Sequence, residues 1–147
     1  MSIVYLILSL RRQVRKGKYK MDDNEIGKYI IDSAINIHQE LGPGLLETVY
    51  EVILANQLQQ KGLKVERQKA IPIEYGGIRF NEGFRADLII ENKVIVELKC
   101  VVKLNNAHKK QLLTYLRLTG LHLGYLLNFS HSLMKDGIHR TVNNLIE

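Results

Sequence analysis

Residues 84–102 read FRADLIIENKVIVELKCVV, and they are the most informative part of the chain about its architecture. It contains two apolar runs, Phe84–Glu91 and Val94–Val102, separated only by Asn92-Lys93. Runs that are apolar on both faces are typical of central strands with structure above and below them. The short polar break between them predicts that the two strands form an antiparallel hairpin.

Charged residues inside these two apolar runs are the most informative feature of the chain. Asp87 lies in the first run, and Glu97 and Lys99 lie in the second. A buried charge costs free energy unless it is paired or binds a metal. Glu97 and Lys99 are two residues apart, so their side chains leave the same face of one strand. If the hairpin is centred on Asn92, Asp87 lies directly opposite Glu97, with Cβ atoms about 5 Å apart, and a slip of one residue would remove this alignment.

Two carboxylates at that separation predict a binding site for a divalent cation. Bare carboxylates would repel each other, and hard cations such as Mg²⁺ or Mn²⁺ prefer oxygen ligands. The main-chain carbonyl of Leu98 is placed to add another oxygen ligand. A lysine beside the metal, Lys99, would orient or deprotonate an attacking water or offset charge growing on a phosphate. The residues alone leave one alternative open: all three charged side chains lie in water at strand ends, with Glu97 and Lys99 as an incidental pair.

The rest of the chain predicts helices and further strands around this hairpin. Apolar residues at helical spacing predict a helix from Asp22 to Leu41 and a second from about Gly44 to Lys61, joined by a tight corner at Gly42-Pro43. Gly76-Gly77 predicts a hairpin turn. The order of elements predicts an α/β fold, a mixed β-sheet flanked by α-helices. The remaining predicted elements are strands at 63–69, 71–75, 78–80 and 122–129, a helix at 106–118, and a short strand or helix within 137–145.

The composition is that of one soluble globular domain. The chain has 147 residues, 46% of them hydrophobic and 24% charged, which excludes wholesale disorder and leaves room for one core. Its single cysteine, Cys100, excludes an internal disulfide and a cysteine-based zinc cage, and it fits a cytoplasmic location. The apolar run at residues 3–8 is far shorter than the ~20 residues that span a bilayer, so we expect no membrane association.

The net charge of +6 comes from one short segment. Residues 11–20 hold six cations and residues 1–20 hold no acid, which leaves 15 cations against 15 acids in residues 21–147. Helix-capping residues follow Met21 directly. We therefore expect residues 1–20 to be a basic extension that could be disordered, and residues 21–147 to form a single domain.

Several motifs in one order resemble a known family. Asp87 followed by Glu97-Leu98-Lys99 matches the PD-(D/E)xK nuclease signature, with Ala86 where proline is often found. Residues 44–50 read GLLETVY, which fits the pattern GxxExxY. Together with Gly42-Pro43, GFRAD at 83–87 and QLLTY at 111–115, these motifs closely resemble the GxxExxY family of the PD-(D/E)xK nuclease superfamily, over roughly residues 24–130.

The resemblance implies a restriction-endonuclease-like fold and a set of site residues. Glu47 would be the early acidic residue that completes the metal site, Asp87 and Glu97 would be the main metal ligands, and Lys99 would be the catalytic lysine. Gln111 and Tyr115 lie one helical turn apart and would line the site and touch the substrate backbone.

Two further residues keep alternative roles. Tyr50 lies three residues after Glu47 on the same helix face, and it is either a core aromatic with a bonded hydroxyl or part of the site. His38 lies near the Gly42-Pro43 corner and could approach Glu47, although the five histidines show no metal-ligand spacing.

The leading functional hypothesis is a metal-dependent phosphodiesterase that acts on DNA or RNA, with Mg²⁺ or Mn²⁺ as cofactor. The alternative is a catalytically silent nucleic-acid-binding or protein-interaction module on the same fold, which the neutral charge of residues 21–147 favours. A hydrolase of another small phosphate ester is a third candidate. No specificity module accompanies the domain, and we expect a homodimer, since compact nucleases often reach both strands by pairing.

Overall fold

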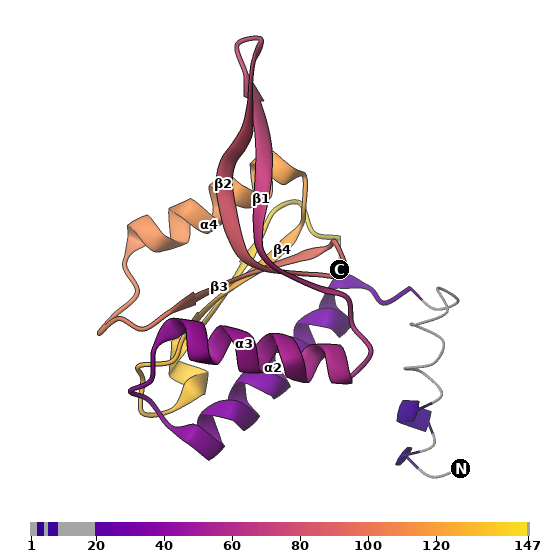
Figure 1. The fold of residues 1–147 in the computed structure, drawn as a ribbon, viewed down its shortest axis with the longest axis vertical. Coiled ribbons are helices and arrows are strands. Elements are labelled where there is room, and N and C mark those ends of the chain that lie inside the picture. The colour runs from indigo at the N-terminus through magenta and orange to yellow at the C-terminus, as the bar shows by residue number, and fades with distance from the viewer. Residues whose placement is uncertain (1–2, 5, 9–19, 147) are drawn as a thin grey trace.

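The computed structural model describes residues 3–4, 6–8 and 20–146, and most of the predicted basic extension lies outside these residues. One five-stranded sheet, in the order β1-β2-β3-β4-β5, separates two helical layers in the described part of the chain (Figure 1). None of the helices described there has the length and apolarity needed to cross a membrane. The predicted α/β architecture, a mixed sheet with helices on its faces, is confirmed. The strands are β1 Val65–Tyr75, β2 Ile78–Ile90, β3 Val94–Lys99, β4 Leu123–Asn128 and β5 Ile138–Val142.

Two helices cover one face of the sheet and a third covers the other (Figure 1). α2 (Asp23–Leu41) and α3 (Glu47–Gln60) are consecutive helices that pack on each other, and α4 (Asn106–Thr119) makes the crossover between β3 and β4. α2 starts where the sequence predicts, because the side chain of Asp22 accepts a hydrogen bond from the main-chain N–H of Glu25 at 2.8 Å. A short 3₁₀ helix, η1 (Met134–Gly137), precedes β5.

Tyr50 fixes the corner between α2 and α3. Its hydroxyl donates to the Gly42 carbonyl at 2.6 Å and accepts from the Leu45 N–H at 3.2 Å. Its ring is fully buried and stacks on Phe129 at 4.3 Å between ring centroids. Tyr50 is therefore a core aromatic with a bonded hydroxyl, and its role is to hold the corner from which α3 begins.

The β2–β3 hairpin has the predicted register. Leu88 pairs with Val96, Ile89 with Ile95, and Ile90 with Val94, which centres the hairpin on Asn92. β3 then pairs in parallel with β4, and the other neighbouring pairs in the sheet are antiparallel. Because both faces of β3 are buried, a slip of one residue would exchange its two sets of apolar side chains, and this fixes the register.

The core consists of two apolar clusters, one on each face of the sheet. The larger lies under α2 and α3 and includes Leu88, Val96 and Leu98. The smaller lies under α4 and includes Ile89, Ile95 and Leu112. Since residues of β3 alternate between these clusters, Glu97 and Lys99 belong with Ile95 on the face that α4 covers.

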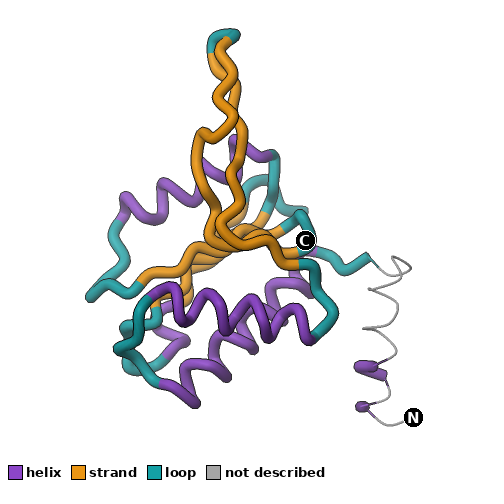
Figure 2. The backbone as a smooth tube through the Cα atoms, viewed as in Figure 1, coloured by secondary structure: helices purple, strands orange, loops and turns teal. Residues whose placement is uncertain are grey.

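β1 and β2 are longer than predicted and form an arm that projects from the sheet (Figure 2). The sequence predicts four short strands at 63–90, whereas the structure has two continuous ones. An irregularity in pairing between Ile71 and Ile73 lets two extra residues of β2 bulge without ending the ladder. Gly83 lies in this bulge, where an added Cβ would overlap the Ile73 side chain. Gly76 and Gly77, both at positive φ, form the predicted turn at the tip.

The end of β3 differs from the prediction, whereas the short element predicted near the C-terminus is confirmed as a strand. β3 ends at Lys99 instead of continuing to Val102, because the chain turns away from the sheet after Cys100. The segment predicted as a short strand or helix within 137–145 is β5, which pairs with β4 as an edge strand.

Candidate functional site

The site begins where the ladder between β2 and β3 ends. Beyond the last backbone pair, Leu88 with Val96, the next opposed residues are Asp87 and Glu97. The carboxylate of Asp87 accepts from the Leu98 N–H at 3.0 Å, and the carboxylate of Glu97 accepts from the Asp87 N–H at 3.3 Å. Side-chain hydrogen bonds therefore replace backbone ones at this point, and they bring the two predicted acidic residues together.

Burial changes the protonation of Glu97. Its side chain is 6% exposed, and burial raises its pKa to about 9. The charge of Asp87 and a hydrogen bond between the two carboxyl groups act in the same direction, whereas the Asp87 N–H and the charge of Lys99 lower the pKa. At neutral pH, in the absence of a cation, Glu97 therefore holds a proton that it shares with Asp87.

The donor set of this pair fits a hard divalent cation. Two carboxyl groups meet there, and Glu97 is protonated at neutral pH because burial disfavours its charge and the charge of Asp87 adds to that effect. The N–H and C=O of a strand residue point to the same side, so the Leu98 carbonyl faces β2 together with its N–H. Among the residues that the structure describes, no group of three or more His, Cys, Asp or Glu side chains is placed to hold a metal. The available ligands are therefore the two carboxylates and the Leu98 carbonyl.

Glu47 does not join Asp87 and Glu97 in a three-carboxylate cluster in the described part of the chain. It is the exposed first residue of α3, and its Oε1 accepts from the Cys100 N–H at 2.9 Å. β3 ends at Lys99, so this N–H has no partner in the sheet ladder and requires another acceptor. Glu47 thus lies at the end of β3, one residue beyond Lys99.

The face covered by α4 carries the other predicted residues. Lys99 is half-buried, and the chain is fixed at this point because its carbonyl accepts from the Phe129 N–H at 3.0 Å. Tyr115 stacks on Phe84, with ring centroids 3.8 Å apart and planes 5° apart. Burial raises the pKa of Tyr115, and the charges of Glu97 and Asp87 raise it further. Gln111 is exposed, one turn earlier on α4.

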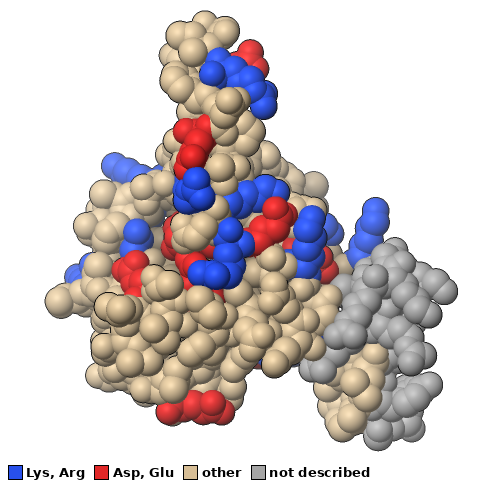
Figure 3. Space-filling view, in the orientation of Figure 1, with Lys and Arg blue, Asp and Glu red and all other residues tan. Residues whose placement is uncertain are grey.

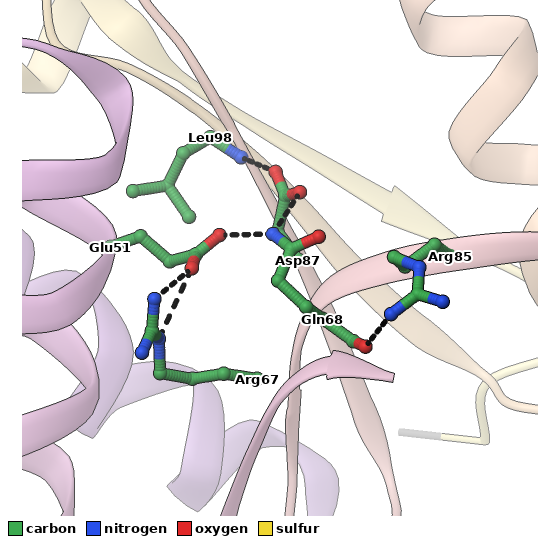
Figure 4. A network of polar contacts seen from close by, with 6 residues as sticks. All are labelled: Glu51, Arg67, Gln68, Arg85, Asp87 and Leu98. Atoms are coloured by element: carbon green, nitrogen blue, oxygen red, sulfur yellow. Dashed lines mark hydrogen bonds and ion pairs between the residues drawn. The ribbon is translucent and has the colours of Figure 1, made fainter. Parts of the chain in front are cut away.

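A polar network beside Asp87 involves residues that the sequence analysis missed (Figure 4). Glu51 of α3 is buried and accepts two hydrogen bonds from the Arg67 guanidinium, at 2.8 and 3.1 Å. The amide of Gln68 donates to Glu51 at 2.6 Å and to Asp87 at 3.1 Å. Arg85 donates to the main-chain carbonyl of Gln68 at 2.9 Å. These contacts join α3, β1 and β2 at the site.

Asn128 is a second residue that the sequence analysis missed. It is fully buried at the end of β4, beside Lys99 in the parallel ladder. Its side chain accepts from the Val101 N–H at 3.2 Å and donates to the Val101 carbonyl at 2.8 Å. A buried amide needs such hydrogen-bond partners. A polar Asn128 within the apolar run 122–129 was therefore the sequence feature that could have indicated this role. It fixes the chain just after Lys99.

His38 and Cys100 each contact a main-chain carbonyl outside the Asp87–Glu97 pair. His38 is buried and its Nε2 contacts the His131 carbonyl at 2.8 Å, next to Phe129. Cys100 is half-buried, with its thiol 3.7 Å from the Leu45 carbonyl. His38 is therefore a core histidine.

Charges of both signs surround the base of the arm. Figure 3 shows Lys and Arg interspersed with Asp and Glu where the arm leaves the body of the protein. Several of these groups are paired, as Arg85 is with Glu82 and Lys69 with Glu66. The face seen in Figure 3 is thus mixed in charge instead of uniformly basic.

Comparison with known proteins identifies the class that this fold and acidic pair define. Residues 24–141 match the family model of the PD-(D/E)XK nuclease superfamily, and the chain belongs to that superfamily. Its mixed sheet with flanking helices is the restriction-endonuclease-like fold. Nucleases of this superfamily generally use divalent metals, and the superfamily suggests a nucleic-acid substrate.

Other comparisons add little. The crystal structure of SSO0001 is similar over 100% of this chain and 80% of that chain, with 22% sequence identity and a TM-score of 0.47. A similarity of that size carries no information on activity. Among curated proteins, no significant match is found.

Proposed function

We propose that this chain is a metal-dependent nuclease that hydrolyses phosphodiester bonds of DNA or RNA. The observation that carries the proposal is the Asp87–Glu97 pair, in which two carboxyl groups meet on adjacent strands and each accepts a hydrogen bond from the main chain of the other strand. Membership of the PD-(D/E)XK superfamily supports it. The proposal assigns the activity to residues 21–147 and leaves residues 1–20 as an extension.

In this proposal, Asp87, Glu97 and the Leu98 carbonyl hold Mg²⁺ or Mn²⁺. A bound divalent ion supplies Lewis acidity and a nucleophilic water near neutral pH. Glu97 releases its proton when the ion binds, since only the carboxylate is a ligand. Glu47, at the start of α3, is the early acidic residue that completes the metal site in this proposal.

The other residues have roles on the substrate side. Lys99 shares a face with Glu97, and its ammonium group orients the water or offsets the charge that grows on the phosphate. Tyr115 and Gln111 contact the substrate backbone from α4. The Phe84–Tyr115 stack supports this role, because it presents an aromatic surface on the sheet face that carries Glu97.

We further propose that the protein belongs to the GxxExxY family, acts in the cytoplasm, and forms a homodimer. The homodimer has support from the arm, where Tyr75, Ile78 and Phe80 are 84%, 61% and 48% exposed. The pairing of Tyr75 with Ile78 and of Ile73 with Phe80 places these apolar side chains on one face of the arm. Light scattering on wild type and Phe80→Asp tests it: a dimer that becomes a monomer supports the interface, and a monomeric wild type contradicts it.

The alternative function is a catalytically silent binding module on the same fold. The neutral charge of residues 21–147 favours it, because surfaces that bind phosphate backbones are usually basic. The absence of a third clustered acid among the described residues favours it as well.

A cleavage assay on a panel of substrates separates the two functions. Labelled single-stranded, duplex and branched DNA and RNA are incubated with Mg²⁺ or Mn²⁺, with Asp87→Ala purified in the same way as a control. Metal-dependent cleavage that Asp87→Ala lacks supports the nuclease. Salt-dependent binding without cleavage of any substrate supports the binding module instead.

A further inference from the structure

Gln68 contacts both Asp87 and the buried acid of α3. Its side-chain NH₂ group donates one hydrogen bond to Glu51 at 2.6 Å and one to Asp87 at 3.1 Å. Ionised carboxylates only accept hydrogen bonds, so the amide must present its nitrogen to both. The second oxygen of Asp87 accepts from the Leu98 N–H. Both oxygens of Asp87 are thus held, one by the main chain of β3 and one by Gln68 (Figure 4).

The backbone of Gln68 is in an unfavourable conformation. Its φ is +49°, a region that residues other than glycine, asparagine and aspartate rarely occupy because the Cβ crowds the backbone there. Its neighbours Arg67 and Lys69 remain in register with Leu88 and Ala86. The strain is therefore confined to the one residue of β1 that lies opposite Asp87.

Glu51 and Arg67 fix the Gln68 amide. Glu51 is 5% exposed and uses one oxygen for Arg67 and the other for Gln68. Arg85 holds the main-chain carbonyl of the same glutamine. Since the carboxylate of Glu51 is held in a salt bridge, it presents a fixed acceptor to the amide, and the amide presents a fixed donor to Asp87.

From these contacts we infer that Gln68 is a positioning residue for the metal site: its amide, fixed by Glu51 and Arg67, orients the Asp87 carboxylate. The inference rests on the proposed metal site and extends it to residues outside the PD-(D/E)XK signature. Outer partners that orient metal ligands typically change metal affinity by about 10–100-fold when removed. The same loss is expected here, without a direct effect of Gln68 on the reacting atoms.

The test is calorimetric titration of Mn²⁺ into the full chain without nucleic acid. Gln68→Gly removes the amide and retains the positive φ at no steric cost, whereas Gln68→Ala removes the amide and disfavours that φ. Gln60→Ala, on the exposed end of α3, is the matched control. We expect the Mn²⁺ Kd to rise about 10–100-fold in both Gln68 variants and to stay within twofold of wild type in Gln60→Ala.

Cleavage by Gln68→Gly should return to the wild-type rate at saturating Mn²⁺, because the metal then compensates for the lost orientation. Wild-type Mn²⁺ affinity in a folded Gln68→Gly variant would overturn the inference, and so would a cleavage defect that saturating Mn²⁺ does not correct. If Gln68→Ala does not fold, the Mn²⁺ affinity of Gln68→Gly alone tests the inference. If wild type binds Mn²⁺ but cuts no substrate, the proposed nuclease activity is contradicted, and the Mn²⁺ titrations still test the positioning role of Gln68. If wild type binds no Mn²⁺, both the proposed nuclease activity and the positioning role are contradicted.

Discussion

Replacement of Glu97 by glutamine should stabilise the protein at neutral pH. Glu97 titrates near 4.5 without the fold and near 9 within it, because burial and Asp87 disfavour its charge. The folded state therefore binds this proton more tightly than the unfolded state does, and stability falls as pH rises from about 4.5 to about 9. At pH 7 the difference amounts to up to about 3 kcal/mol in the free energy of unfolding. Glu97→Gln keeps the shape and a donor for Asp87 but has no proton to lose.

Urea denaturation in the presence of a chelator measures this difference. The gain of Glu97→Gln over wild type should be absent at pH 4.5 and should grow through pH 6, 7 and 8. Glu40→Gln, which changes an exposed carboxylate of α2, should show no such trend. A Glu97→Gln variant that is less stable than wild type at pH 7, or a gain that is the same at every pH, would refute the reasoning.

Two further predictions concern the pH dependence of Mn²⁺ binding and the hydrogen bonds of Asn128. The Mn²⁺ Kd of wild type should fall about tenfold per pH unit between pH 6 and 8 and level off above about pH 9, because Glu97 must lose its proton to bind the ion. Titration calorimetry at several pH values measures this Kd. A Kd that does not depend on pH would contradict the prediction. Asn128→Leu should lower the free energy of unfolding by about 2–4 kcal/mol, since the N–H and C=O of Val101 lose their partners. Urea denaturation measures this loss. A loss below about 0.5 kcal/mol would contradict the contacts assigned to Asn128.

The hairpin that carries the acidic pair could be predicted from the sequence for a physical reason. Both runs around Asn92 are apolar on both faces, so any slip in pairing would move buried side chains to the wrong face. Symmetry about Asn92 then places Asp87 opposite Glu97, and the structure has this register. The starts of α2 and α4 and the turn at Gly76-Gly77 depend on local capping and backbone conformation, which a sequence also records. The start of α3 at Glu47, later than the predicted Gly44, has no side-chain cap.

The network around Gln68 could not be predicted in this way. It joins Glu51 of α3 to Arg67 and Gln68 of β1, and such contacts depend on how α3 packs on the sheet instead of on any local pattern. The positive φ of Gln68 gives no sequence signal, because glutamine is not a residue that favours that conformation.

The length of the arm and the contact of Glu47 also could not be predicted from a local sequence pattern. Polar residues at 81–82 interrupt the apolar pattern of β2, so a strand prediction stops there, although pairing with β1 continues across the bulge. The GxxExxY motif points to Glu47, but the contact of Glu47 with the Cys100 N–H follows from where β3 ends.

The most direct test of the central claim is the initial rate of cleavage of a labelled nucleic acid as Mn²⁺ is titrated, for wild type, Asp87→Ala and Glu97→Ala purified identically. Wild type should cut at least one substrate in a metal-dependent way, and both variants should fall to background while remaining folded. Equal cleavage by wild type and both variants, or no cleavage by wild type at any metal concentration, would contradict that claim.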